Sequence, residues 1–175
     1  MKGRHSEIKL RNGIVIKKFH PEFRYNFWKE LVFLNSLQPF FFVPRLIDHN
    51  SARLEIKMEF VRGQHIGEII ENIGANQIEK ILNICRILDM LGIQKEEMNH
   101  PDRHIIIGKR IVFIDFERSV LKDRPSNLTQ FVTYLNFKRK IICMDELIKM
   151  MKPYKMNFDE ISYRNVRETI LSRIE

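Results

Sequence analysis

The chain has few of the features that mark secreted, zinc-binding or membrane proteins. Its 175 residues include only two cysteines, Cys85 and Cys143, which lie far apart and have no CxxC partner. Two lone cysteines provide neither a disulfide framework nor a zinc site, and they fit a reducing compartment. No window approaches 18 uncharged apolar residues, and the first residues, MKGRHSE, lack the apolar core of a signal peptide. We therefore expect a soluble cytoplasmic protein with no membrane partner.

Internal repeats and low-complexity runs are also absent, and the composition is that of a folded protein. Hydrophobic residues make up 44% of the chain and charged residues 30%. This length allows one domain, or two small lobes that share a cleft. Thirty lysines and arginines against 22 acids give a net charge of +8, which favours anionic partners such as nucleotide or RNA. Alternatively, the positive net charge reflects only the general amino-acid composition of a lysine- and isoleucine-rich proteome and gives no information about partners.

The first sixty residues show the patterns of short strands around one helix. Residues 7–19 predict a hairpin, because Asn12-Gly13 is a strong two-residue turn signal between apolar stretches. Residues 22–37 have apolar side chains at helical spacing, with Glu30 inside the helix. Extended segments follow at 44–48 and 53–60. The order is strand, strand, helix, strand, strand.

After Gly63 the pattern becomes mainly helical. Helices are expected at residues 64–73, 76–91, 126–138, 143–152 and 159–174. We expect Asn76 and Glu79 to form a capping box at the start of the second helix, and Gly92 to end it. Two short strands at 105–107 and 111–114 interrupt the helical part.

The most informative segment runs from Gly92 to Glu117. The apolar run 111–114 predicts a buried strand, and Asp115 stands where it ends. A carboxylate among apolar residues is costly unless it meets a cation or a metal ion. Glu97 and His104 lie on the preceding loop. Together these side chains offer what phosphoryl transfer to a hydroxyl needs, namely a group that orients the nucleophile and ligands for magnesium.

This segment resembles the protein-kinase superfamily, in particular the small archaeal kinases of the RIO and KEOPS-associated type. Asp115-Phe116-Glu117 is similar to the D-F-G metal motif, with Glu in place of Gly. The stretch 92–98 resembles G-I-V-H-G-D-L without gaps, so the resemblance places Glu97 at the catalytic Asp and Lys95 at the His. It places His104 at the second metal-binding Asn. Asp102 is the competing catalytic acid, because His100-Pro101-Asp102 reads as H-x-D, but it lies only two residues before His104.

The resemblance continues in the first part of the chain. Ile14-Val15-Ile16-Lys17 is similar to V-A-I-K, which implies that Lys17 holds nucleotide phosphates and that Glu30 pairs with it. Residues 58–63 resemble the hinge, which implies that Glu59 and Val61 bind adenine through their backbone. The phosphate-covering loop is reduced to Gly3-Arg4-His5-Ser6-Glu7, without the usual G-x-G-x-x-G.

The family resemblance implies an α+β, two-lobed protein kinase-like fold. A small antiparallel β N-lobe of up to five strands would occupy residues 1–60, and a reduced helical C-lobe residues 61–175. The implied activity is ATP-dependent phosphotransfer to a hydroxyl with Mg2+, as in an atypical serine/threonine protein kinase. The alternative is a pseudokinase-like module that binds nucleotide, protein or RNA without transfer. The substitutions Glu97 for Asp, His104 for Asn and Glu117 for Gly favour it.

Each candidate residue also has an ordinary structural interpretation. Lys17 and Glu30 would then be solvated charges, Glu97 part of a solvated turn, and His104 a structural histidine. No A-P-E element follows Glu117, so a protein or RNA-associated substrate would bind another surface. The basic patch Lys138-Arg139-Lys140 would serve RNA or simply end a helix. Nothing in the sequence predicts recognition of a DNA sequence.

Overall fold

The structure is a computed structural model that describes residues 5–174. It divides into two compact units that are interleaved in the sequence. Unit 1 comprises residues 5–64 and 104–119, and unit 2 comprises residues 65–103 and 120–174. Unit 1 therefore joins the N-terminal strands to the short hairpin that carries Asp115. The division at residue 60 expected from the sequence stays a prediction.

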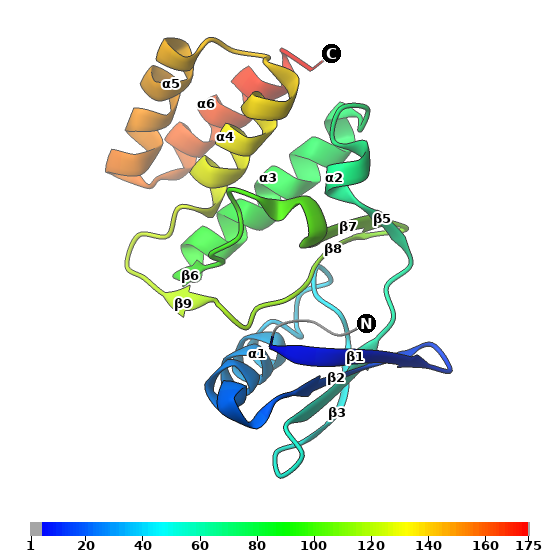
Figure 1. The fold of residues 1–175 in the computed structure, drawn as a ribbon. Coiled ribbons are helices and arrows are strands. Elements are labelled where there is room, and N and C mark those ends of the chain that lie inside the picture. The colour runs from blue at the N-terminus through cyan, green and yellow to red at the C-terminus, as the bar shows by residue number, and fades with distance from the viewer. Residues whose placement is uncertain (1–4, 175) are drawn as a thin grey trace. The chain divides into compact units, whose positions relative to one another are not determined.

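An antiparallel sheet of four strands forms the centre of unit 1 (Figure 1). Its strands, in spatial order, are β1 (Ser6–Arg11), β2 (Ile14–Phe19), β4 (Glu55–Glu59) and β3 (Leu46–Asn50). This confirms the small antiparallel N-terminal sheet expected from the sequence.

The β1–β2 hairpin turns at Asn12-Gly13, as predicted. Both residues have positive φ angles, 49° and 75°, and Arg11 pairs directly with Ile14 across the turn. Asparagine and glycine tolerate this left-handed backbone, whose twist matches that of the flanking strands. The turn fixes which residues of β2 face inwards, because a slip of one residue would reverse every side chain.

One helix, α1 (Arg24–Ser36), packs on this sheet after the short 3-10 turn η1 (Pro21–Phe23). Its Phe27 is fully buried and meets Phe19 of β2 edge to face, with ring centroids 5.9 Å apart. The aromatic contact joins helix to strand in the core. Because α1 lies against β2, Glu30 faces inwards.

A second sheet completes unit 1 and contains β5 (Gly63–His65), β7 (Ile105–Gly108) and β8 (Ile111–Phe113). A Cβ atom at Gly63 would lie 2.5 Å from the backbone oxygen of Ile107, so only glycine allows this close approach. The β7–β8 hairpin confirms the two short strands expected around residues 105–114. β5 was not predicted.

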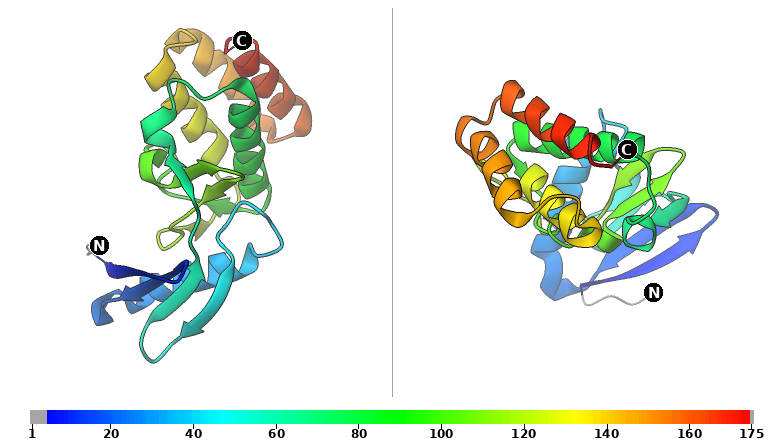
Figure 2. Two further views of the ribbon diagram at one scale, coloured as in Figure 1. Left: turned by 90° about the vertical axis from the view of Figure 1, so that its right-hand side faces the viewer. Right: turned by 90° about the horizontal axis from the view of Figure 1, so that it is seen from above.

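Unit 2 is mainly helical (Figure 2). Its elements are α2 (Ile66–Ile69), α3 (Ala75–Met90), α4 (Asn127–Arg139), α5 (Met144–Asn157), α6 (Glu160–Leu171), the 3-10 turn η2 (Pro101–Arg103), and the two-residue strands β6 (Ile93–Gln94) and β9 (Val120–Leu121). Each predicted helix is present. Among the described residues, no helix is long and apolar enough to cross a bilayer.

The start of α3 differs from the prediction, and its end agrees. The helix begins at Ala75 with Gly74 as N-cap and no side-chain cap, so Asn76 lies inside the first turn and the predicted capping box is wrong. Gly92 follows the end of the helix with φ of +71°, the left-handed conformation expected of a terminating glycine.

Candidate functional site

Lys17 lies on strand β2 and is buried within unit 1, which is unusual for a lysine side chain. Only 5% of the residue is exposed, since the pleat of β2 directs it inwards between Ile16 and the exposed Lys18. The solvated-charge interpretation of Lys17 is therefore wrong. A buried ammonium group requires anionic partners.

The Lys17 Nζ atom meets three carboxylates. It lies 2.8 Å from Asp115 Oδ1, 3.0 Å from Glu117 Oε2 and 3.6 Å from Glu30 Oε2. Glu30 comes from α1 and is 2% exposed, so it is not the solvated helix residue of the alternative interpretation. We call Lys17, Glu30, Asp115 and Glu117 the carboxylate cluster.

Asp115 and Glu117 reach Lys17 from the segment that follows β8. Between them Phe116 is fully buried, which fixes the backbone and leaves both acids beside the lysine. Asp115 itself has a φ of +66°, an unusual conformation for a residue other than glycine. Such backbone strain persists only where the surrounding structure holds it. The second oxygen of Glu117, Oε1, lies 2.5 Å from His5 Nδ1.

The electrostatics of the cluster keep Lys17 charged. Burial lowers the pKa of the ammonium group, but the charges of Glu30, Asp115 and Glu117 together outweigh it and raise the pKa well above its ordinary value. Among the residues that the structure describes, one ammonium group thus lies among three carboxylates.

The cluster has the donor chemistry of a divalent-cation site. Glu30, Asp115 and Glu117 each offer one oxygen, and these oxygens lie within 4.8 Å of one another. Mg2+ prefers carboxylate oxygens as ligands. Asp115 is the most accessible ligand, because 36% of its side chain is exposed against 3% for Glu30 and 7% for Glu117.

His104, the second metal ligand predicted from the sequence, lies beside this segment but is not one of the three acids. It precedes β7, and its backbone oxygen accepts a hydrogen bond from Ile114 N at 2.9 Å. The hydrogen bond joins the start of β7 to the residue before Asp115. A metal-binding role for His104 stays a prediction.

The residues expected to bind adenine lie at the end of β4. The Glu59 side chain contacts Arg110 Nη2 at 2.5 Å and accepts a hydrogen bond from Arg45 N at 3.0 Å. Its side chain is thus engaged within unit 1. Val61 lies in the segment between β4 and β5 and is half-buried. Their adenine-binding role also stays a prediction.

Glu97, the predicted catalytic acid, belongs to unit 2 and contacts a buried lysine. Lys95 has a fully buried side chain, and its Nζ lies 3.4 Å from Glu97 Oε2, with Glu97 12% exposed. The backbone nitrogen of Lys95 donates to Asn127 Oδ1 at 2.8 Å, which fixes the segment against α4. Lys95 therefore holds the Glu97 side chain in position, and a catalytic role for Glu97 stays a prediction.

Asp102, the competing acid, is committed to contacts inside unit 2. Its Oδ1 accepts a hydrogen bond from the Tyr134 hydroxyl at 3.0 Å and lies 3.1 Å from Lys138 Nζ. Burial raises the pKa of the carboxyl group, but these two partners outweigh it, and the pKa is lowered. A Cβ atom at Gly67 would lie 2.6 Å from Asp102 Cβ, so the acid packs tightly on α2. A catalytic role for Asp102 stays a prediction.

Sequence reasoning missed the part that Glu117 and His5 play. Glu117 was noted only as a departure from D-F-G, and His5 only as part of a reduced loop, of which Gly3 and Arg4 lie outside the described residues. The available signal was the alternation Asp115-Phe116-Glu117, in which one buried ring places two acids on the same side.

Comparisons with known proteins agree with this fold without assigning a family. No family model matches the chain. An uncharacterized protein of Methanocaldococcus jannaschii is 28% identical over 82 residues, which cover 45% of this chain and 71% of that protein.

Similarity to solved structures extends over almost the whole chain. The Rio2 kinase from Chaetomium thermophilum matches with a TM-score of 0.63 and 14% identity, over 98% of this chain and 70% of that one. A complex of the same kinase with ADP/Mg2+ and phosphoaspartate matches with a TM-score of 0.55 and 15% identity, over 99% and 69%. At this identity the likeness concerns the fold alone. The chain therefore has a two-lobed, protein kinase-like α+β fold.

Proposed function

We propose that the protein is an ATP-dependent phosphotransferase, an atypical serine/threonine protein kinase resembling the small archaeal RIO and KEOPS-associated kinases and acting in the cytoplasm. The observation that carries this proposal is the ion pairing of one buried lysine, Lys17, with Glu30 and Asp115. A kinase-like fold has its phosphate-binding lysine, the glutamate that braces it and its metal-binding aspartate in these roles.

In this proposal each member of the carboxylate cluster has a separate task. Lys17 binds the phosphates of ATP, and Glu30 holds the ammonium group in place from α1. Asp115, the most exposed acid, would hold magnesium, which when bound would neutralise the charge of the phosphates. Glu117 would keep a carboxylate beside Lys17.

Glu97 orients the hydroxyl group that receives the phosphoryl group. A carboxylate that accepts the hydroxyl proton suffices for this task, since transfer depends mostly on positioning and electrostatics. The buried ammonium group of Lys95, 3.4 Å from Glu97, supports this role because it positions the carboxylate. The substrate of the proposed reaction is a protein or an RNA-associated component.

A second candidate function is nucleotide binding without transfer. The contact of Lys17 with a third carboxylate, Glu117, favours it, because this acid competes with phosphate for the ammonium group. The substitutions at Glu97, His104 and Glu117 relative to the kinase motifs point the same way.

Thermal unfolding with ATP, with and without magnesium, tests the proposal. Ligand at about a hundred times its dissociation constant stabilises a protein by about 2.7 kcal/mol, which raises the unfolding temperature by several degrees. Lys17→Met should lose this shift, and Lys18→Met, its exposed neighbour, should keep it.

Transfer of labelled phosphate from ATP then separates the two candidates. Magnesium-dependent stabilisation with autophosphorylation supports the kinase, and stabilisation without any transfer supports the binding module. A protein that ATP does not stabilise under either condition contradicts both candidates.

A further inference from the structure

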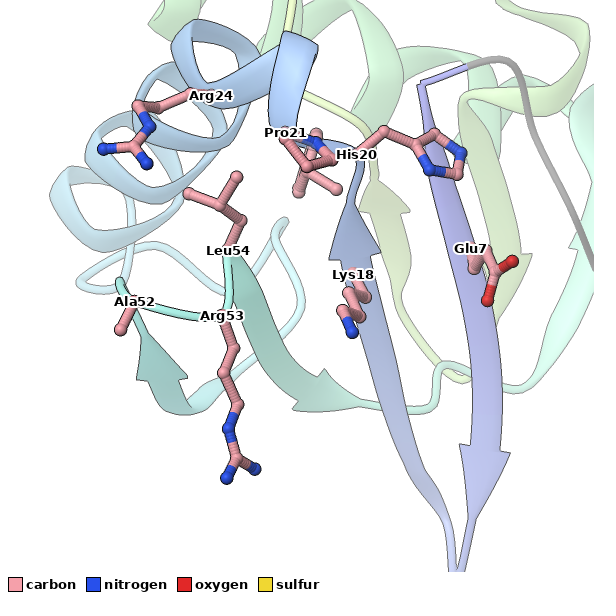
Figure 3. A pocket seen from close by; sticks show the side chains of 9 residues that line it. Glu7, Lys18, His20, Pro21, Arg24, Ala52, Arg53 and Leu54 are labelled. Atoms are coloured by element: carbon pink, nitrogen blue, oxygen red, sulfur yellow. The ribbon is translucent and has the colours of Figure 1, made fainter.

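A basic pocket lies at the end of β2 in unit 1, away from the cluster around Lys17. Four basic side chains, Lys18, His20, Arg24 and Arg53, line this pocket (Figure 3), and the buried residues Phe19 and Leu54 form its floor. The cavity has a volume of about 500 Å3. We call it the basic pocket.

The backbone of the basic pocket is held on both sides of β2. Phe19 N donates a hydrogen bond to Leu54 O at 2.9 Å, and His20 N donates to His5 O at 3.1 Å. Phe19 and Leu54 are 2% and 4% exposed, so the floor belongs to the core of unit 1. The basic side chains therefore stand on fixed positions, which limits the entropy that a ligand must remove.

The cations of the basic pocket have no partners within the described chain. Lys18, Arg24 and Arg53 are exposed, and none of the three side chains forms an ion pair or a hydrogen bond with another residue of the range 5–174. The one acid that lines the pocket is Glu7, which lies opposite Lys18 in the β1–β2 register, and Glu55 lies opposite Lys18 on β4. Among the lining residues, basic side chains outnumber acidic ones.

The cations do not converge on one point. In Figure 3 the Arg24 and Arg53 side chains extend in different directions from Leu54, and Lys18 lies apart from both. This arrangement suits a ligand with several separated negative charges, such as a nucleic-acid backbone, better than a single phosphate or carboxylate group.

His20 and Pro21 add a second kind of surface to the pocket. His20 is half-buried and Pro21 exposed, and both border the floor. Histidine rings stack on unpaired bases, and single-stranded nucleic acid is bound by such rings combined with cations that follow the backbone. An acidic peptide would use the cations but would gain nothing from the ring.

We propose that the basic pocket binds single-stranded nucleic acid, with Lys18, Arg24 and Arg53 on successive phosphates and His20 stacked on a base. The inference rests on unit 1 alone and does not depend on the proposed kinase activity. The overall net charge of +8 supports association with such a polyanion.

Fluorescence anisotropy of labelled oligouridylate and oligodeoxythymidylate of about 12 nucleotides tests the proposal. Binding is measured without ATP at several salt concentrations. Each phosphate contact to a single strand contributes about 0.7 to the slope of log affinity against log salt. The triple variant Lys18→Ala, Arg24→Ala, Arg53→Ala should lower this slope by about 2 and weaken binding at least tenfold. His20→Ala should weaken binding and leave the slope unchanged.

A matched control removes the same charge elsewhere. Arg11, Lys149 and Arg164 are exposed residues outside the pocket, and their triple alanine variant should keep nearly the full affinity. Thermal unfolding establishes that both triple variants fold. Equal losses in the two variants would mean binding by net charge, and unchanged affinity in the pocket variant would place the site elsewhere. Equally tight binding of polyglutamate, lost in the same variant, would identify an acidic-protein surface instead. Each of these three results overturns the proposal.

Discussion

Lys17 and Lys18 are neighbours on β2 but have opposite environments, since Lys17 is buried among three carboxylates and Lys18 is exposed at the basic pocket. The pleat of the strand separates them. The Asn12-Gly13 turn sets the register of β2 and therefore decides which lysine faces inwards. Two adjacent lysines of the same chemistry thus offer a matched pair of substitutions.

Removing the Lys17 charge should lower the free energy of unfolding at neutral pH. In the wild type the raised pKa of Lys17 gives a contribution that is fully present below its unfolded pKa of about 10.4 and is lost only above the folded pKa. In Lys17→Met the three carboxylates repel one another. Leaving buried charge uncompensated typically costs about 3–5 kcal/mol. Urea unfolding at neutral pH should show a loss of this size.

The sign of the pH effect in Lys17→Met follows from the acids that remain. Carboxylates that Lys17 no longer neutralises repel one another, and this repulsion weakens when acid is added, so the variant should regain part of its stability as the pH falls. Lys18→Met should follow the wild type throughout. A Lys17→Met profile parallel to that of the wild type would mean that the carboxylate cluster does not hold the charge assigned to it.

Asp115 and Glu117 should differ in their effect on magnesium. Asp115→Asn should remove the additional stabilisation that magnesium gives in the presence of ATP, because Asp115 is the acid that solvent reaches most easily. Glu117→Gln should retain most of it, since the Glu117 side chain is 7% exposed and is held between Lys17 and His5. Thermal shifts with ATP at several magnesium concentrations measure both effects. The reverse order would make Glu117 the metal ligand.

Features decided by local chemistry were predictable from the sequence. The Asn12-Gly13 turn, the helices after Gly63 and the position of Asp115 after a buried strand follow from turn residues, apolar period and strand ends. The contact of Lys17 with Glu30 was expected only because the ordered motifs resemble a family. Periodicity alone does not distinguish a buried lysine from a solvated one.

Features that depend on distant or very short segments were not predictable. The contact between His5 and Glu117 joins residues 112 positions apart, and nothing local to either residue indicates it. Strands β6 and β9 have two residues each, too few for an alternating pattern. The spacing of Asn76 and Glu79 fits a capping box, but the helix already begins at Ala75 with Gly74 as its cap.

Asp89 should be the most sensitive polar residue for the stability of unit 2. Its carboxylate accepts hydrogen bonds from Asn127 N at 2.8 Å, Leu128 N at 3.2 Å and the Tyr154 hydroxyl at 2.8 Å. The buried acid thereby caps the start of α4 and ties it to α3 and α5. Asp89→Ala should lower the free energy of unfolding by about 3 kcal/mol or more, because several buried donors lose their acceptor. Glu168→Ala, an exposed acid on α6, is the control in urea unfolding and should change stability by less than about 0.5 kcal/mol.

Substitutions of Glu97 and Asp102 should have different effects on the rate of phosphoryl transfer. Loss of a group that orients the nucleophile typically costs about 10²- to 10⁴-fold in rate. Autophosphorylation with labelled ATP should therefore collapse in Glu97→Gln and survive in Asp102→Asn. Asp102→Asn should instead lower the stability of unit 2 by about 1 kcal/mol, since it weakens the contacts with Tyr134 and Lys138 at a partly exposed site.

The pH dependence of stability gives a second distinction between the two acids. Because the pKa of Asp102 is lowered in the folded state, its contribution is present above the unfolded pKa of about 3.9 and is lost as the pH falls through the folded pKa. Wild-type protein should lose this contribution below about pH 4, and Asp102→Asn should lack it at every pH. If Asp102→Asn instead abolishes transfer while its unfolding profile matches that of the wild type, Asp102 is the catalytic acid. The resemblance of residues 92–98 to the catalytic loop would then be misaligned by several residues.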